Sequence, residues 1–173
     1  LQLAHSLGEW NSGAGKTLAD LAASSDEDPW MRAAVLSSAL PHQQALAAAL
    51  TLDSAATLQA FLPDLLTLAL ATRTPSALRQ LLGAAVSPDT NVPLPLRLRT
   101  LARFLETLAS KKTSWPALVA EHPELAGLSD PMDQLIGKAS KIAVDSHIAE
   151  HLRAAATSLL GLNRHGKKEA RDI

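Results

Sequence analysis

Apolar residues recur every three or four positions along most of the chain. Because an α-helix makes one turn in about 3.6 residues, this spacing places the apolar side chains on one face of a helix. The pattern therefore predicts helices of roughly 9 to 17 residues joined by short polar links. The clearest series are Leu78, Leu81, Leu82 and Ala85; Leu98, Leu101, Phe104 and Leu108; and Ile148, Leu152, Ala155 and Leu159.

Prolines mark where several of these helices are expected to begin. Three of them follow a residue that can cap a helix, in Asp28-Pro29, Thr74-Pro75 and Asp130-Pro131. A proline in the first turn loses no hydrogen bond, because the N–H that it lacks would have no partner there. Pro41, Pro63 and Pro116 are predicted as further starts, which gives roughly eight to ten helices. The link 87–95, with three prolines, is the only one long enough to form a wrapped loop.

Composition agrees with a helical chain. Leucine and alanine supply 65 of the 173 residues, against five valines, four isoleucines and no tyrosine. Strands favour β-branched and aromatic residues, whereas helices favour alanine and leucine. We therefore predict an all-α fold.

Charge and cysteine content exclude several classes of function. A formal net charge of −1 gives no general attraction to nucleic acid or to an anionic membrane. The absence of cysteine excludes disulfides, thiolate metal sites and covalent haem attachment. The richest apolar run, Leu65–Ala71, is far shorter than the roughly 20 residues that cross a bilayer. Leu1 opens directly onto an apolar pattern, so we expect a fragment of a longer protein.

One short helical pattern occurs more than once. The segment Met31–Leu40 (MRAAVLSSAL) aligns with Leu152–Gly161 (LRAAATSLLG), and both contain an Arg-Ala-Ala motif that begins at Arg32 or Arg153. Leu98–Thr107 keeps the Leu-Arg start and the apolar spacing, and the opening LQLAHSLG fits the same frame. Recurrence of a helical unit is typical of an α-solenoid, in which each hairpin buries its apolar face against the next. The irregular spacing of the arginines indicates divergent repeats.

The segment 28–40 resembles the second helix of a HEAT repeat, with a capping Asp28, Pro29, Arg32 and the pair Ala33-Ala34. More specifically, Leu1–Leu40 and residues 153–166 resemble the helical segment of large bacterial multidomain haem-binding proteins. In that family a β-propeller dehydrogenase-like domain precedes HEAT-like repeats, and a c-type cytochrome domain with a Cys-x-x-Cys-His motif follows. The resemblance implies a HEAT-like α-α superhelix, that is, a right-handed α-solenoid. It also implies an exported protein, periplasmic or otherwise, in which this segment is a spacer or docking surface without its own cofactor.

The string Gly-Ala-Gly-Lys-Thr at 13–17 is similar to part of a nucleotide-binding loop. A Walker A loop requires Gly-x4-Gly-Lys-[Ser/Thr] after a buried strand. Counting back five positions from Gly15 leads to Trp10, and Gly8 lies two positions too early. The preceding segment is predicted to be a helix, not a strand. We expect a turn between two helices, with Gly13 or Gly15 near the end of the link and Lys16 facing solvent.

The segment His147–His151 (HIAEH) matches the inverted zinc-peptidase motif His-x-x-Glu-His. Two histidines four positions apart share a helix face, so both could reach one metal, with Glu150 as the base. A catalytic site needs a third ligand, and only Glu169 and Asp172 follow, in a polar tail. We expect a solvated helix face, and keep a zinc-dependent hydrolase as the rival hypothesis.

A basic group offers a third hypothesis, a HEAT-like module that binds nucleic acid. It consists of Arg97, Arg99, Arg103, Lys111 and Lys112. Arg99 and Arg103 share a helical face, but Glu106 interrupts the series. We expect solvated arginines on a repeat surface. Three tryptophans, Trp10, Trp30 and Trp115, stand near predicted helix ends, where a ring can seal the gap between hairpins.

These observations predict one HEAT-like domain over residues 1–163, followed by a polar, frayed tail over 164–173. We expect no catalytic activity, no metal site and no cofactor in this segment. Asp28, Pro29 and Arg32 are expected to be structural, with Asp28 capping a helix and Arg32 within its reach one turn later. The expected partners are other domains of the parent protein or another protein, with no nucleic acid and no membrane. The chain is expected to be a monomer.

Overall fold

The computed structural model describes residues 2–10, 13–24, 28–53 and 55–169. Every regular element in these ranges is a helix, which confirms the all-α prediction. The described residues form ten α-helices and two 3₁₀ helices, in line with the expected number. They are α1 (Gln2–Gly8), α2 (Ala14–Ser24), α3 (Pro29–Ser38), η1 (Leu40–His42), α4 (Gln43–Asp53), α5 (Ala55–Ala71), α6 (Pro75–Val86), α7 (Leu94–Ser110), α8 (Trp115–Glu121), η2 (Pro123–Leu128), α9 (Ser129–Val144) and α10 (Glu150–Glu169).

Contacts divide the chain into two compact units, Leu1–Leu81 and Leu82–Ile173. The boundary falls inside α6. Nothing in the apolar pattern marks it, because Leu81 and Leu82 belong to the same continuous helical series. The single domain expected over residues 1–163 therefore contains two units by contact, which are described separately below.

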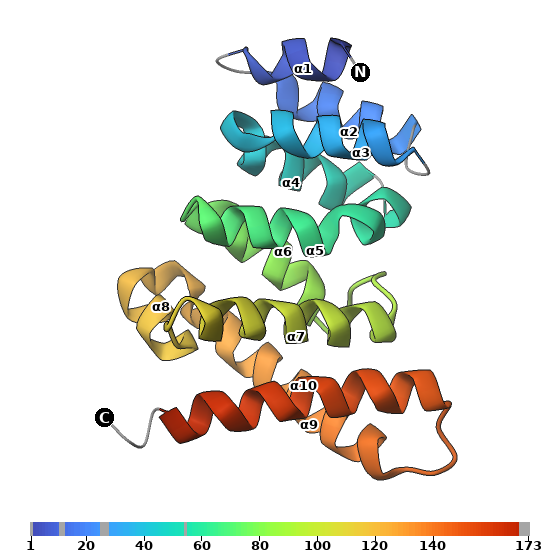
Figure 1. Cartoon of the computed structure of the whole chain (residues 1–173), viewed down its shortest axis with the longest axis vertical. Helices are drawn as coiled ribbons and strands as arrows, with labels where there is room; N and C mark the ends of the chain where they lie inside the picture. Colours follow the sequence, from blue (N-terminus) through green and yellow to red (C-terminus); the bar gives the residue numbers. More distant parts are fainter. Residues whose placement is uncertain (1, 11–12, 25–27, 54, 170–173) are drawn as a thin grey trace. The chain divides into compact units, whose positions relative to one another are not determined.

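In unit 1, helices pack on neighbours that are close in the sequence. Helix α1 packs on α2 and α3, α2 packs on α3, α4 and α5, and α4 packs on α5 (Figure 1). The η1 turn is tied to α1 by His42, a buried side chain whose Nε2 donates to the carbonyl oxygen of Leu7 at 2.9 Å. The largest fully buried side chains are Leu18, Leu46, Leu50, Phe61, Leu62, Leu66, Leu78 and Leu81.

Three polar contacts in unit 1 join residues about 30 positions apart in the sequence. The Thr72 hydroxyl donates to Oε1 of Gln43 at 2.9 Å, and Nε2 of Gln80 donates to the Thr51 hydroxyl at 3.1 Å. Each of these bonds spans 29 residues, and the bond from Arg32 to Asp64 spans 32. Polar side chains therefore connect segments of unit 1 at a nearly constant separation in the sequence.

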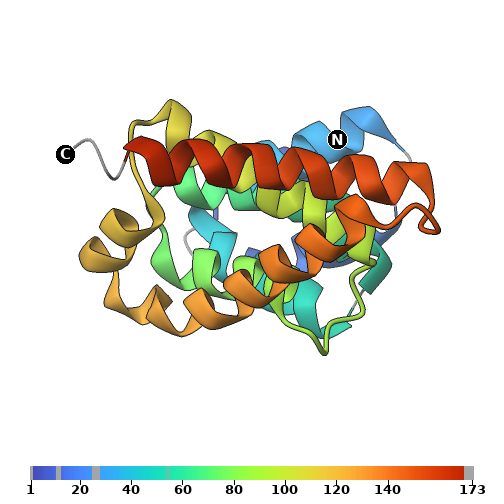
Figure 2. The same ribbon diagram turned by 90° about the horizontal axis from the view of Figure 1, so that it is seen from below.

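In unit 2, α10 packs along α7 and across α9, and both α8 and α9 contact η2 (Figures 1 and 2). Its fully buried large side chains are Leu82, Leu98, Leu101 and Leu125. Helix α10 continues to Glu169 and so includes the first six residues of the segment 164–173 that was expected to be a tail. Residues 170–173, the end of that tail, lie outside the described residues.

Proline marked most helix starts correctly. Pro29 and Pro75 begin α3 and α6, Pro116 is the second residue of α8, and Pro41 lies in η1. Two predictions were wrong. Helix α9 begins at Ser129 with no side-chain cap, so Asp130 is a first-turn residue and not the cap. Pro63 lies inside α5.

The position of Pro63 has a packing explanation. A proline in a helix interior costs about 3 kcal/mol. The buried residues Leu58, Phe61, Leu62, Leu65 and Leu66 lie on both sides of it in one helical series. Burial of each such side chain contributes about 1.5–3 kcal/mol, so continuous burial outweighs the cost of the proline.

Two helices end in the same way. Arg73 after α5 and Lys112 after α7 have positive φ angles, 53° and 52°. The next residue donates back to the helix in each case, with Thr74 N–H bonded to the carbonyl of Ala69 and Thr113 N–H to that of Leu108, both at 3.0 Å. This is the Schellman arrangement, which satisfies carbonyls that the helix leaves without partners.

Candidate functional site

The first turn of α3 is built as the sequence predicted. Asp28 is the N-cap, with extended backbone angles (φ −90°, ψ 110°), and Pro29 is the first helical residue. The Asp28 carboxylate accepts a hydrogen bond of 2.9 Å from the N–H of Trp30. One of the donors that a helix start leaves unpaired is thereby satisfied. The predicted cap is confirmed.

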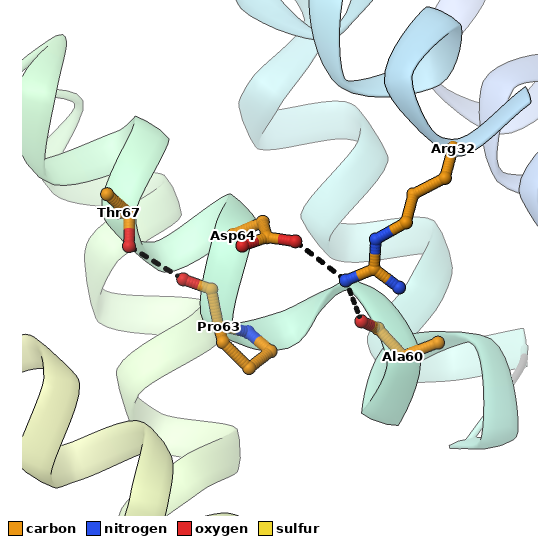
Figure 3. Close-up of polar contacts among 5 residues, drawn as sticks. All are labelled: Arg32, Ala60, Pro63, Asp64 and Thr67. Atoms are coloured by element: carbon orange, nitrogen blue, oxygen red, sulfur yellow. Dashed lines mark hydrogen bonds and ion pairs between the residues drawn. The ribbon is translucent and has the colours of Figure 1, made fainter. Parts of the chain in front are cut away.

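The partner of Arg32 is not Asp28, and that part of the prediction was wrong. Its Nη2 donates to Oδ2 of Asp64 at 2.6 Å and to the carbonyl oxygen of Ala60 at 2.5 Å (Figure 3). Its guanidinium also lies 5.0 Å from the centre of the Phe61 ring. All three partners belong to α5, so Arg32 joins α3 to a helix about 30 residues later. The long side chain reaches this helix, whereas the Asp28 carboxylate already serves the backbone of its own turn.

The interior proline of α5 lies in the turn that Arg32 contacts. Pro63 cannot donate to the helical ladder, and its ring disturbs the preceding turn. The Ala60 carbonyl in that turn accepts from Arg32, and the Pro63 carbonyl accepts from the Thr67 hydroxyl at 2.8 Å (Figure 3). Arg32 therefore binds α5 through a carboxylate, a carbonyl and an aromatic ring that lie within five consecutive positions.

The basic group is not a continuous surface. Arg97 is buried, with 8% of its surface exposed, so the expectation that it is solvated was wrong. Its Nε and Nη2 donate to the carbonyl oxygens of Ala85 and Val86, each at 2.8 Å. These carbonyls end α6, where no further helical N–H can reach them. Burial lowers the pKa of Arg97 below its ordinary value, through desolvation of the charged form. Arg99 and Arg103 are exposed, as expected. Arg97 differs from them, because its guanidinium is bonded to the end of α6.

The Gly-Ala-Gly-Lys-Thr string is a helix start. Gly13 has a φ of +83° and stands just before α2, while Lys16 is exposed, as expected. Gly15 lies inside α2 and not in the link. A Cβ at Gly15 would overlap the Cβ of Ala45 and would lie 2.8 Å from the N of Leu46. This glycine therefore allows α2 and α4 to pack backbone against backbone, and the preceding element, α1, is a helix.

The HIAEH segment does not present two histidines on one helix face. Helix α10 begins at Glu150, so His151 is helical while His147 lies in the turn before it. There the His147 N–H donates to the Asp145 carboxylate at 2.9 Å, which stabilises the turn. The helix predicted from Ile148 thus begins two residues later. In the described part of the chain, no three histidine or acidic side chains are close enough to hold a metal ion.

The tryptophans differ in their surroundings. Trp115 is half-buried, stacks edge-on against Phe104 at a centroid distance of 6.2 Å, and donates from Nε1 to the Ser129 hydroxyl at 3.0 Å. It joins the start of α8 to α7 and to the first residue of α9, as expected of a ring that seals a gap between helices. Trp10 and Trp30 are 58% and 74% exposed, so they do not seal gaps between helices.

A hollow of about 590 Å³ lies between α7 and α10 in unit 2. Its lining consists of Glu106, Ala154, Thr157, Ser158, Gly161 and Leu162. Only one of these side chains is charged. Besides Glu106, the polar side chains of the lining are the hydroxyls of Thr157 and Ser158.

The two best-aligned segments have nearly the same burial pattern. Met31–Leu40 and Leu152–Gly161 agree in burial class at all positions except two, Leu36 against Thr157 and Ala39 against Leu160. The arginines Arg32 and Arg153 are both half-buried. The third segment differs, because Thr100 and Phe104 are buried where Ala33 and Ser37 are exposed. The two segments that contain the Arg-Ala-Ala motif therefore agree in burial at eight of their ten aligned positions.

Comparisons with protein-family models, with curated proteins and with solved structures find no match to this chain. Within the described residues, no α-helix combines the length and hydropathy that a bilayer-spanning segment requires. Three contacts between helices involve residues that the sequence analysis singled out: Arg32 with α5, Arg97 with the end of α6, and Gly15 with α4. Each of them joins helices.

Proposed function

We propose that this chain is a non-catalytic, HEAT-like helical-repeat segment that acts as a spacer and protein-contact surface within a larger exported, haem-binding redox protein. The arrangement would be a right-handed α-solenoid of helical hairpins. The partners would be other domains of the parent protein or another protein. The segment itself would be monomeric, without a cofactor and without nucleic acid or membrane as ligand.

The observation that carries this proposal is the agreement between the segments Met31–Leu40 and Leu152–Gly161. They share the Arg-Ala-Ala motif and, at all but two positions, the same burial class. Polar contacts at offsets of 29 and 32 residues in unit 1 support a repeating hairpin in the same way. In a repeat protein each unit contacts mainly its neighbours, and the outward faces form an extended binding surface.

The haem-protein context is tested by the gene that surrounds this coding segment. We expect sequencing to show an export signal and a β-propeller domain upstream, and a Cys-x-x-Cys-His motif downstream. A gene that encodes no such motif on either side would contradict the redox context. A gene that encodes further helical repeats alone would leave the scaffold role in place and remove its link to haem.

A further inference from the structure

The Arg-Ala-Ala motif has different surroundings at its two sites. At the first, the Arg32 guanidinium is engaged by Asp64, the Ala60 carbonyl and the Phe61 ring of α5. At the second, Nε of Arg153 is buried and has no hydrogen-bond partner among the described residues. A buried donor without an acceptor forfeits the hydration that it had in water. Among the described residues, no hydrogen bond of the Arg153 side chain corresponds to the bonds that Nη2 of Arg32 makes with α5.

The two positions at which the segments differ in burial lie on the face that carries the arginine. Thr157 and Leu160 follow Arg153 by four and seven residues, so all three share one face of α10; we name it the Arg153 face. Leu36 and Ala39, at the equivalent positions of unit 1, are each one class more buried. The Arg153 face is thus more open than the face of Arg32, while the rest of the two segments is buried alike.

We propose that the Arg153 face docks a partner helix that presents a carboxylate, in the way that α5 presents Asp64 to Arg32. This inference rests on the proposed scaffold function and names the kind of partner. The partner helix would have an aromatic residue three positions before its aspartate or glutamate, as Phe61 precedes Asp64. The carboxylate would accept a charge-assisted bond from the guanidinium, and the ring would lie against the guanidinium plane. Apolar side chains beside them would cover Leu160.

The probe is a synthetic peptide of residues 55–71, the α5 sequence, with a short lysine tail at its C-terminus for solubility. The full chain is labelled with ¹⁵N on arginine, and the Nε–H signal of Arg153 is assigned by its absence in Arg153→Met. We expect saturable binding, measured by fluorescence anisotropy, with a shift of that signal. Binding should weaken about tenfold when the peptide carries Asp64→Asn, and about tenfold when the chain carries Arg153→Met.

Arg153→Met should retain the melting temperature and circular dichroism of the parent chain, because Nε of Arg153 makes no bond to any of the described residues. Arg32→Met is the matched variant, and it should lower the melting temperature because its bonds to α5 are lost. Absence of peptide binding, or binding that survives Arg153→Met, would overturn the docking site. An Arg153 signal that already senses a carboxylate of the chain's own residues 164–173 would also overturn it, as would a shift produced by self-association alone. None of these outcomes alters the gene context, so the docking site and the proposed function fail independently.

Discussion

Gly15→Ala is expected to lower the free energy of unfolding by about 2 kcal/mol, within the range found for overpacked cores. The added Cβ would overlap the Cβ of Ala45 and would meet the backbone N of Leu46 at 2.8 Å. The second of these is backbone, so α2 and α4 must move apart. Chemical denaturation measures the change. The melting temperature should fall by roughly 4–8 °C.

Gly137→Ala is the matched control for this substitution. Gly137 lies exposed in the interior of α9, and a Cβ added to it would meet no atom within 4 Å outside its own helical turns. Alanine should therefore stabilise the helix there by about 0.5–1 kcal/mol. If both substitutions changed stability by the same amount and sign, the close approach of α2 and α4 at Gly15 would be refuted.

Arg97→Met is expected to cost about 2–3 kcal/mol, a second large effect. Methionine keeps much of the aliphatic stem but leaves the carbonyls of Ala85 and Val86 without their donors. Those residues are buried, and an unsatisfied buried acceptor costs about 1–3 kcal/mol. Loss of the desolvated charge offsets part of this cost. The stability of Arg97→Lys should lie between those of the parent chain and Arg97→Met. A lysine ammonium group can donate to a carbonyl but lacks the planar fork that reaches both carbonyls.

The control for Arg97→Met is the substitution Arg99→Met, two positions later in the same helix. Arg99→Met removes an exposed guanidinium from the same helix and should change stability by no more than about 0.5 kcal/mol. Equal losses for the two variants would show that Arg97 does not bond the end of α6. Electrophoretic mobility shifts with DNA should be absent for both variants and for the parent chain, because the basic group is interrupted at Arg97.

Features set by local sequence were the ones that could be predicted. Asp28 and Pro29 form a cap whose partners lie within two residues, and the series Leu78, Leu81, Leu82 and Ala85 is buried as its spacing indicated. The exposed position of Lys16 followed from the same kind of reasoning. Such predictions need only the geometry of one helix.

Features that depend on a second helix were missed. Arg32 and Asp64 are 32 residues apart, and no local pattern relates them. Arg97 was grouped with Arg99 by charge, although a shift of two positions places it on the buried face. The sequence did contain a signal for Gly15. The apolar residues Leu18 and Ala19 follow it by three and four positions, which places the glycine on their helix face, and both are buried. The histidine spacing implied that His147 is helical. In the structure it lies in a turn that the Asp145 carboxylate stabilises, before α10 begins.

The pair Arg32 and Asp64 offers the most direct measurement of whether the Arg-Ala-Ala arginine joins helices, which is the central claim. A double-mutant cycle would combine Arg32→Ala with Asp64→Ala in urea denaturation, and a second cycle would combine Arg32→Ala with Asp28→Ala. Both side chains of the Arg32–Asp64 pair keep about a third of their surface exposed (31% and 27%), so solvent screens the interaction. We expect a coupling of about 1 kcal/mol for Arg32 with Asp64, and additivity within about 0.5 kcal/mol for Arg32 with Asp28. Additivity in the first cycle together with coupling in the second would contradict the claim, because Arg32 would then serve only its own helix cap.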